Sequence, residues 1–145
     1  DTRITAAAFA NKTLSKNSEI LSEVYDLGIV PFNQYFSKIK LFNFYDIDTL
    51  PEKTLELEEQ LNNTNLIILP SQRILHARFL NKNTFPNGYF FYKNLMGEKI
   101  GFKLIYKTPC DFLCKALYMG DPIFNVELTA NAFDRPTIFI FKRNN

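Results

Sequence analysis

The sequence predicts a mainly β fold, an antiparallel β-sandwich that carries one or two short inserted helices. Several segments alternate apolar and polar residues, and clusters of Pro, Asn and Gly separate them. The two helical patterns do not alternate regularly with the strand patterns, which argues against a doubly wound α/β sheet. Fifteen Phe and seven Tyr give such a sandwich a strongly aromatic core.

Length and composition indicate one folded domain. The 145 residues match the usual size of a single domain, so residues 1–145 are expected to form one unit. A hydrophobic content of 46% is enough for a substantial core. The net charge is +2 and the cations are scattered along the chain, which argues against nucleic acid as a partner. No apolar run approaches the roughly 20 residues that a membrane-spanning helix needs.

The N-terminal part predicts a strand and an inserted helix. The β-branched residues of Thr2–Phe9 indicate an opening strand. A loop with an inserted helix is expected at about 11–35, where an amphipathic stretch covers 18–27. Ser18 suits the N-cap of this helix, and Gly28 offers the left-handed residue that ends it.

The middle of the chain predicts three strands and one more helix. Phe36–Ile47 is apolar on both faces, as in the interior of a sandwich. Pro51 marks the start of an amphipathic helix at about 51–61. Leu66–Pro70 and Ser71–Lys82 are expected to form two adjoining strands that are broken at the proline.

The C-terminal part predicts a turn followed by three strands. Pro86–Gly88 has the composition of a tight turn. Glu98–Lys107 alternates most clearly, with apolar residues on one face and lysines on the other. Pro122–Ala130 and Thr137–Lys142 are expected to close the sandwich as a hairpin.

The two cysteines, Cys110 and Cys114, follow the clearest strand. A zinc site needs about four ligands, and this chain offers two Cys and one distant His. A thioredoxin-like centre uses Cys-x-x-Cys, which is one residue shorter. Two structural alternatives remain open: a pair of buried thiols, or a local disulfide in an exported protein.

Other chemistry-bearing residues do not form a recognisable motif, so no catalytic residue, cofactor or metal is expected. His76 fits a structural histidine on a mixed surface. Asp46 and Asp48 could in principle provide acid–base chemistry or bind Ca²⁺, but solvated Asp at a strand end is commoner. Glycine-rich phosphate loops, nucleophile elbows and His-Glu-x-x-His are absent from the sequence.

Several stretches in this order resemble the outer-membrane lipoproteins of bacterial type VI secretion systems. They are "SKIKLFNFYDI", "LIILPSQRILHARFL", "KIGFKLIYK" and "FNVELTANAFDRPTIFIF". The pattern covers about two thirds of the chain. The resemblance implies a transthyretin-like sandwich that is non-enzymatic and lies at the periplasmic face of the outer membrane. The family's lipidated Cys is expected upstream of Asp1.

The resemblance also implies a partner. Proteins of this family bind the periplasmic part of the large inner-membrane component and so anchor the secretion machine. The family contact maps to the loop after the first strand, and its apolar residues are the candidate anchors: Leu27, Ile29, Val30 and Phe32. The alternative is that these residues pack the inserted helix onto the sandwich.

Two further functions stay open at the level of sequence. The chain could be a secreted module that binds a carbohydrate or another ligand through its aromatic residues. It could also be a small enzyme that uses Asp46, Asp48 or His76, although no supporting constellation is visible in the sequence.

Overall fold

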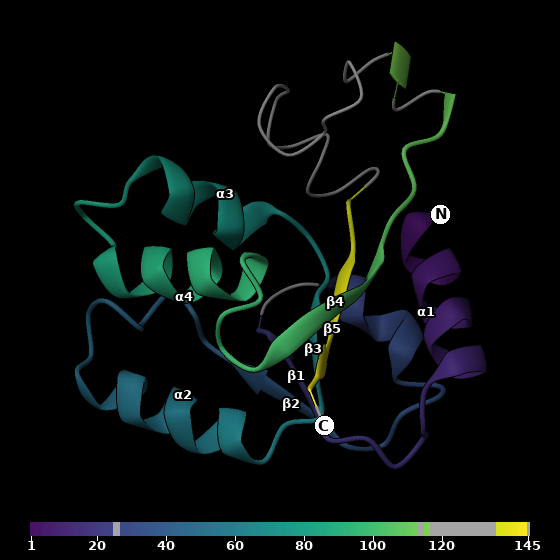
Figure 1. The fold of residues 1–145 in the computed structure, drawn as a ribbon, viewed down its shortest axis with the longest axis horizontal. Helices are drawn as coiled ribbons and strands as arrows, with labels where there is room; N and C mark the ends of the chain where they lie inside the picture. Colours follow the sequence, from purple (N-terminus) through teal and green to yellow (C-terminus); the bar gives the residue numbers. More distant parts are fainter. Residues whose placement is uncertain (25–26, 113–114, 117–135, 145) are drawn as a thin grey trace.

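The computed structural model describes residues 1–24, 27–112, 115–116 and 136–144. Within these ranges a mixed β-sheet lies between two layers of helices (Figure 1). The elements in chain order are α1 Thr2–Thr13, β1 Ile20–Glu23, the 3-10 helix η1 Leu27–Phe32, β2 Ile39–Phe42, α2 Glu52–Asn62, β3 Leu66–Leu69, α3 Arg73–Leu80, α4 Pro86–Met96, β4 Phe102–Lys107 and β5 Phe139–Arg143.

The predicted antiparallel sandwich is wrong. The described residues form a single sheet of five strands in the order β2-β1-β3-β5-β4, and helices cover both of its faces. Strands β1, β2 and β3 are parallel, whereas β5 runs antiparallel to both β3 and β4. The fold is therefore a mixed α/β sheet with helices on both faces, in which only β1, β2 and β3 are wound as parallel strands.

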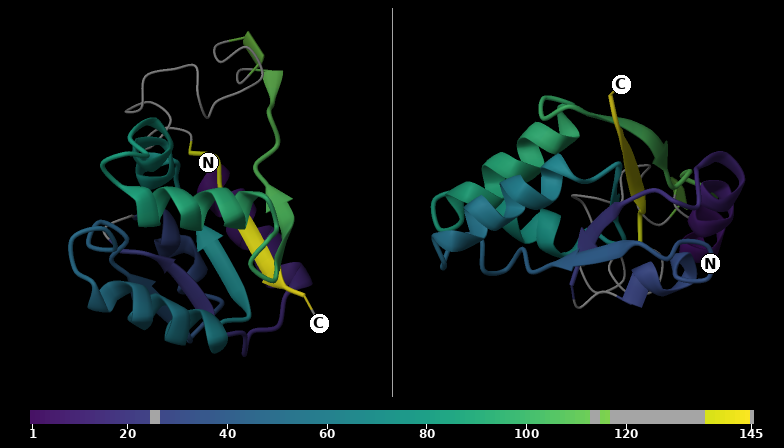
Figure 2. Two further views of the ribbon diagram at one scale, coloured as in Figure 1. Left: turned by 60° about the vertical axis from the view of Figure 1, so that its left-hand side comes forward. Right: turned by 90° about the horizontal axis from the view of Figure 1, so that it is seen from below.

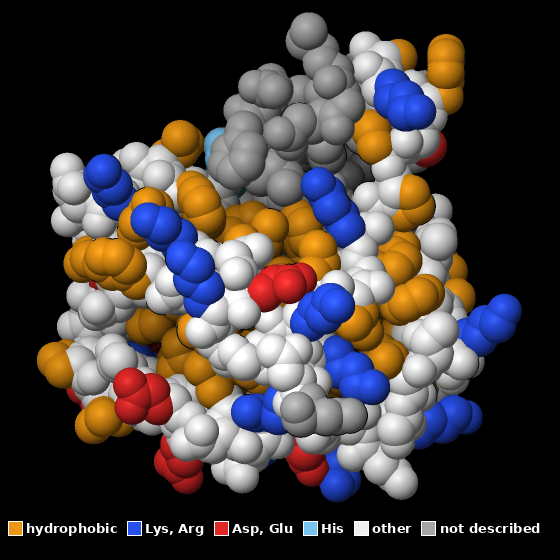
Figure 3. Space-filling model, in the orientation of Figure 1, with side chains coloured by type: hydrophobic (Ala, Val, Ile, Leu, Met, Phe, Trp, Pro, Cys, Tyr) orange, Lys and Arg blue, Asp and Glu red, His pale blue; other side chains and the backbone are white. Residues whose placement is uncertain are grey.

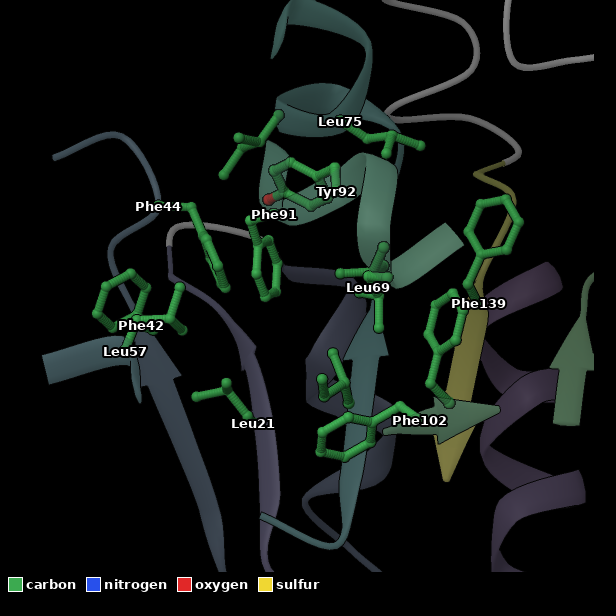
Figure 4. Packing of buried hydrophobic residues seen from close by; sticks show 14 of the residues in the cluster. Leu21, Phe42, Phe44, Leu57, Leu69, Leu75, Phe91, Tyr92, Phe102 and Phe139 are labelled. Carbon is green, nitrogen blue, oxygen red and sulfur yellow. The ribbon is translucent and has the colours of Figure 1, made fainter. Parts of the chain in front are cut away.

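Alternating side chains of the inner strands build a separate core on each face of the sheet. Leu66 and Ile68 pack with α1 and η1, whereas Ile67 and Leu69 pack beneath α2, α3 and α4. Figure 2 shows these helix layers on opposite sides of the sheet. Figure 4 shows the larger core, in which Phe44 stacks on Phe91 of α4 and the Tyr92 ring meets the Phe91 ring edge-on.

Two N-terminal predictions are wrong. Thr2–Phe9 is the start of helix α1 and not a strand, because Ala6, Ala7 and Ala10 form a narrow buried face. The Asp1 side chain accepts a hydrogen bond from the Arg3 N–H and caps this helix. The expected helix at 18–27 contains instead the buried strand β1, whose four residues pair with β2 and whose first three also pair with β3.

Two predictions in the middle of the chain are also wrong. Ser71–Lys82 holds helix α3, in which Ile74 and Leu75 face the core and Arg78 is buried. Pro86–Gly88 is the first turn of α4, where the missing N–H of Pro86 is tolerated. The expected strand at 36–47 is shorter than predicted, because only Ile39–Phe42 pairs with β1.

Other elements lie where the patterns place them. The structure has α2 over the expected range 51–61, β3 within Leu66–Pro70 and β5 within the last apolar run. The regular alternation predicted for β4 is interrupted by a register shift between Leu104 and Tyr106, so Tyr106 packs with Ile105 on the smaller core and not with Leu104 on the larger one. The predicted strand Pro122–Ala130 lies outside the described residues.

A buried charge pair fastens α3 and α4 to the chain that follows β2. The Asp48 carboxylate accepts hydrogen bonds from the backbone N–H groups of Asn87 (2.6 Å) and Gly88 (3.1 Å) at the start of α4. Its Oδ2 atom lies 3.9 Å from Nε of Arg78 on α3, and both side chains are buried. Arg78 also donates to the carbonyls of Phe44 and Tyr45.

We predict that Gly88→Ala destabilises the protein, although Gly→Ala in an open helix raises stability by about 1 kcal/mol. A Cβ at this position would lie 2.8 Å from Cδ of Arg78 and 3.0 Å from Oδ2 of Asp48. Because both neighbours are buried, the expected loss is about 1–3 kcal/mol in the free energy of unfolding, measured by urea titration. Asn94→Ala on the same helix is the control and should change it by less than about 0.5 kcal/mol. A more stable Gly88→Ala variant would contradict the packing described.

Candidate functional site

The order of the parallel strands marks one edge of the sheet as a candidate binding site. From β1 the chain passes through η1, on one face, to β2, and then through α2, on the other face, to β3. The winding therefore reverses between β1 and β3. In open α/β sheets, ligands bind beyond the carboxyl ends of the strands at such a reversal.

Polar residues are concentrated at this edge. Glu23 is the last residue of β1, and Ser71 and Gln72 lie between β3 and the first residue of α3, Arg73. All three side chains are buried. Because parallel strands β1 and β3 are in direct register, their carboxyl ends and these residues meet at the same edge.

Two polar side chains at the end of β1, Ser22 and Glu23, are held by defined hydrogen bonds. The Ser22 hydroxyl donates to the Ile68 carbonyl at 2.8 Å and ties β1 to β3. The Tyr92 hydroxyl on α4 donates to Oε1 of Glu23 at 2.6 Å. Burial of a carboxylate is costly unless it is hydrogen-bonded, so this contact is required to keep Glu23 inside.

Gln72 differs from its neighbours. Its side chain is 0% exposed, and both its amide oxygen and its amide nitrogen lack a hydrogen-bond partner. Its backbone is fixed, because its carbonyl accepts from the His76 N–H of α3 at 2.8 Å. A buried unpaired amide costs about 1–3 kcal/mol, which makes Gln72 the position at this edge that a ligand would satisfy.

The surroundings of Tyr92 also change its acidity. Burial, together with the neighbouring Glu23 carboxylate, raises the pKa of the Tyr92 hydroxyl well above its ordinary value of 10.0. Tyr92 is therefore a hydrogen-bond donor throughout the physiological range, and it positions Glu23 rather than exchanging a proton with it.

Of the residues that the sequence offers as catalytic candidates, Asp46, Asp48 and His76, the two aspartates make structural contacts. Asp48 caps α4 and faces Arg78, as described above. Asp46 accepts a hydrogen bond from Nδ2 of Asn43 at 2.6 Å in the turn after β2. His76 is half-buried on α3. In the described ranges no three His, Cys, Asp or Glu side chains are grouped as a metal site requires.

The four predicted anchor residues divide into two pairs. Ile29 is 5% exposed and Phe32 is fully buried, and both pack against α1 in the smaller core. Leu27 is 80% exposed and Val30 is about half exposed on the outer side of η1. A partner can reach only the second pair while the domain stays folded.

The candidate disulfide stays a prediction. Cys114 lies outside the described residues, so the structure does not describe its pairing with Cys110. Among the described residues, no helix is long and apolar enough to cross a membrane.

Glu23 and Gln72 were missed by sequence reasoning for separate reasons. The sequence pattern predicts an amphipathic helix around Glu23, and its partner Tyr92 lies 69 positions away in sequence. For Gln72 the pattern predicts a strand. The available signal was the change from the apolar run Leu66–Leu69 to Pro-Ser-Gln, which is typical of a strand that passes into a helix.

We predict opposite outcomes for matched substitutions in η1. Ile29→Asp places an unpaired carboxylate in the smaller core and should lower the free energy of unfolding by more than about 3 kcal/mol. Leu27→Asp changes an exposed side chain and should alter it by less than about 0.5 kcal/mol. Thermal denaturation followed by circular dichroism measures both. Equal effects of the two variants would show that the burial of η1 is misassigned.

We predict a stability loss above pH 10 that depends on Tyr92. Tyrosine in the unfolded chain loses its proton above about pH 10, whereas buried Tyr92 keeps its proton because its pKa is raised. The contribution of Tyr92 to the free energy of unfolding is therefore complete below about pH 10 and is lost as the pH rises further. Tyr92→Phe should be about 1–3 kcal/mol less stable at pH 7, because Glu23 loses its donor. The difference between the two proteins, measured by urea unfolding from pH 8 to 11, should shrink with rising pH. A constant difference would contradict the assignment.

Comparison with known proteins does not assign the chain to a family. No protein-family model, no curated protein and no solved structure matches it. The resemblance to type VI secretion lipoproteins therefore stays a prediction, and the interpretation of the site rests on the strand order and on Glu23, Gln72 and Tyr92.

Proposed function

We propose that this chain is a non-catalytic binding domain that holds a small polar molecule beyond the carboxyl ends of β1 and β3. The observation that carries the proposal is Gln72, whose buried amide has neither a donor nor an acceptor partner at the reversal of the strand order. A protein keeps such a costly group where function requires it, since an apolar side chain of the same size would be more stable.

The chemistry of the edge defines the class of ligand. The Gln72 amide offers one acceptor and two N–H donors, and the Glu23 carboxylate is an acceptor. A ligand that presents several hydroxyl or amide groups, such as a sugar or an amino-acid derivative, can match both kinds of group. Because Gln72 is enclosed in the structure, binding has to be coupled to a local opening of this edge.

We predict that Gln72→Met raises the stability of the protein and abolishes its binding of the ligand. Methionine has a similar volume and no amide, so the ligand-free variant should be more stable than the wild type by about 1–3 kcal/mol. The wild type should show a rise in melting temperature with at least one member of a panel of monosaccharides, disaccharides and amino acids, each at millimolar concentration. The variant should lose that rise.

A control variant tests whether the loss of the ligand response is specific to Gln72. Gln60→Met on α2 changes the same residue type far from the edge and should leave the ligand response intact. A Gln72→Met variant that still responds to the ligand, or a wild type that responds to no member of the panel, would contradict the proposal.

The anchoring role stays a prediction that rests on the resemblance alone, and the sandwich that the resemblance implied is wrong. The same holds for the expected lipid anchor and the outer-membrane location. If a partner contacts η1, the contact is centred on Leu27 and Val30, because Ile29 and Phe32 belong to the core.

A further inference from the structure

The outer surface of the larger helix layer divides into a basic part and an acidic part. Residues 71–97, which include α3 and α4, contain no Asp or Glu. The neighbouring helix α2 carries four glutamates, Glu52, Glu56, Glu58 and Glu59. Figure 3 shows Lys and Arg side chains over α3 and α4 at the upper left and acidic side chains over α2 at the lower left.

The basic part contains a groove along α4. The groove has a volume of about 520 Å³ and is lined by Lys82, Asn83, Pro86, Tyr89, Phe90 and Lys93, which we call the α4 groove. Phe90 is 56% exposed and its ring meets the Tyr89 ring edge-on, so the groove presents an aromatic surface. Nζ of Lys93 lies 5.4 Å from the centre of the Tyr89 ring.

The acidic part carries a single large apolar side chain that protrudes from α2. Leu55 is 69% exposed, and Glu52, Glu58 and Glu59 lie three or four positions from it, on the same helical face. These four residues form what we call the α2 stripe. The stripe is an apolar projection between carboxylates, whereas the α4 groove is an aromatic hollow between two ammonium groups.

Among the described residues, the charges of the two surfaces are not used in ion pairs. In the described residues, neither Lys82 nor Lys93 forms an ion pair, and neither Glu58 nor Glu59 does. The glutamate of α2 that does form one is Glu56, which pairs with Lys53 at 2.6 Å and lies outside the stripe. The two surfaces are therefore complementary in shape and charge, and both are open to a partner.

We infer that the α4 groove binds the α2 stripe of a second copy of this chain. Leu55 of one copy lies against Tyr89 and Phe90 of the other, and Glu58 and Glu59 face Lys82 and Lys93. Since α2 and α4 cover the same side of the sheet, a two-fold axis generates both contacts at once and closes the assembly as a dimer. This surface is independent of the ligand site proposed above.

The same observations favour a second copy over other anionic partners. A membrane surface would meet a protruding apolar region rather than a groove, and an unrelated acidic peptide would leave the α2 stripe uncovered. Exposed ion pairs contribute little each, so a reversible dimer is expected at high protein concentration. Its stability should fall with added salt, because the paired charges are exposed.

Sedimentation velocity of the full chain, from micromolar to millimolar concentration at low ionic strength, tests the inference. The wild type should form a concentration-dependent dimer. Lys93→Glu and Glu59→Lys should each raise the dimer dissociation constant about tenfold, because each reversal disturbs both symmetric contacts. Combining the two reversals in one chain should restore the affinity to within about threefold of the wild type.

Controls separate this contact from a general effect of charge. Lys16→Glu changes an exposed lysine after α1, on the other side of the sheet, and should leave the dissociation constant unchanged. Circular dichroism confirms that each variant is folded. A wild type that stays monomeric at every concentration, or a combined variant that dimerises no better than the single variants, would overturn the inference.

Discussion

The burial of β3 on both faces is the constraint on which the rest of the structure depends. Leu66–Leu69 pairs with β1 on one side and with β5 on the other. Its side chains alternate between the two cores, so that this one strand contributes to both. Each of its residues is buried, and full burial of an aliphatic side chain contributes about 1.5–3 kcal/mol. A polar substitution at any of the four positions would therefore weaken one of the two helix layers directly.

The buried polar groups around this strand fall into two kinds. In the first kind, a polar contact joins two elements: Asp48 accepts hydrogen bonds from the first turn of α4 and faces Arg78 of α3. Tyr92 of α4 likewise donates to Glu23 of β1. Gln72 is held by its backbone while its amide is left without a partner. A site that binds a ligand by hydrogen bonds needs this combination of a fixed frame and unsatisfied groups.

The sequence predicted those elements whose pattern is unambiguous. The apolar run of β3, the amphipathic repeat of α2 and the apolar strand β5 were all identified. The predicted fold class was wrong because several short segments have apolar patterns that fit both a strand and a helix. In 71–82 the apolar residues fit either period, and the buried Arg78 is explained by Asp48, thirty positions earlier in the chain. In α1 the β-branched residues near the N-terminus are typical of a strand, whereas the helix forms because Ala6, Ala7 and Ala10 pack on the smaller core. Candidate site residues were harder to predict, because the burial of Glu23 depends on the distant Tyr92.

The position of β5 has a consequence for how the protein acquires its structure during synthesis. β5 is the last strand in the described chain, yet it lies between β3 and β4 and is hydrogen-bonded to both. On the ribosome, β4 therefore emerges before the strand that attaches it to the sheet, and the apolar edge of β3 stays open until residues 139–143 have left the exit tunnel. The nascent chain thus depends on a late, long-range pairing, and a stall in translation before this point would expose an edge that is prone to aggregate.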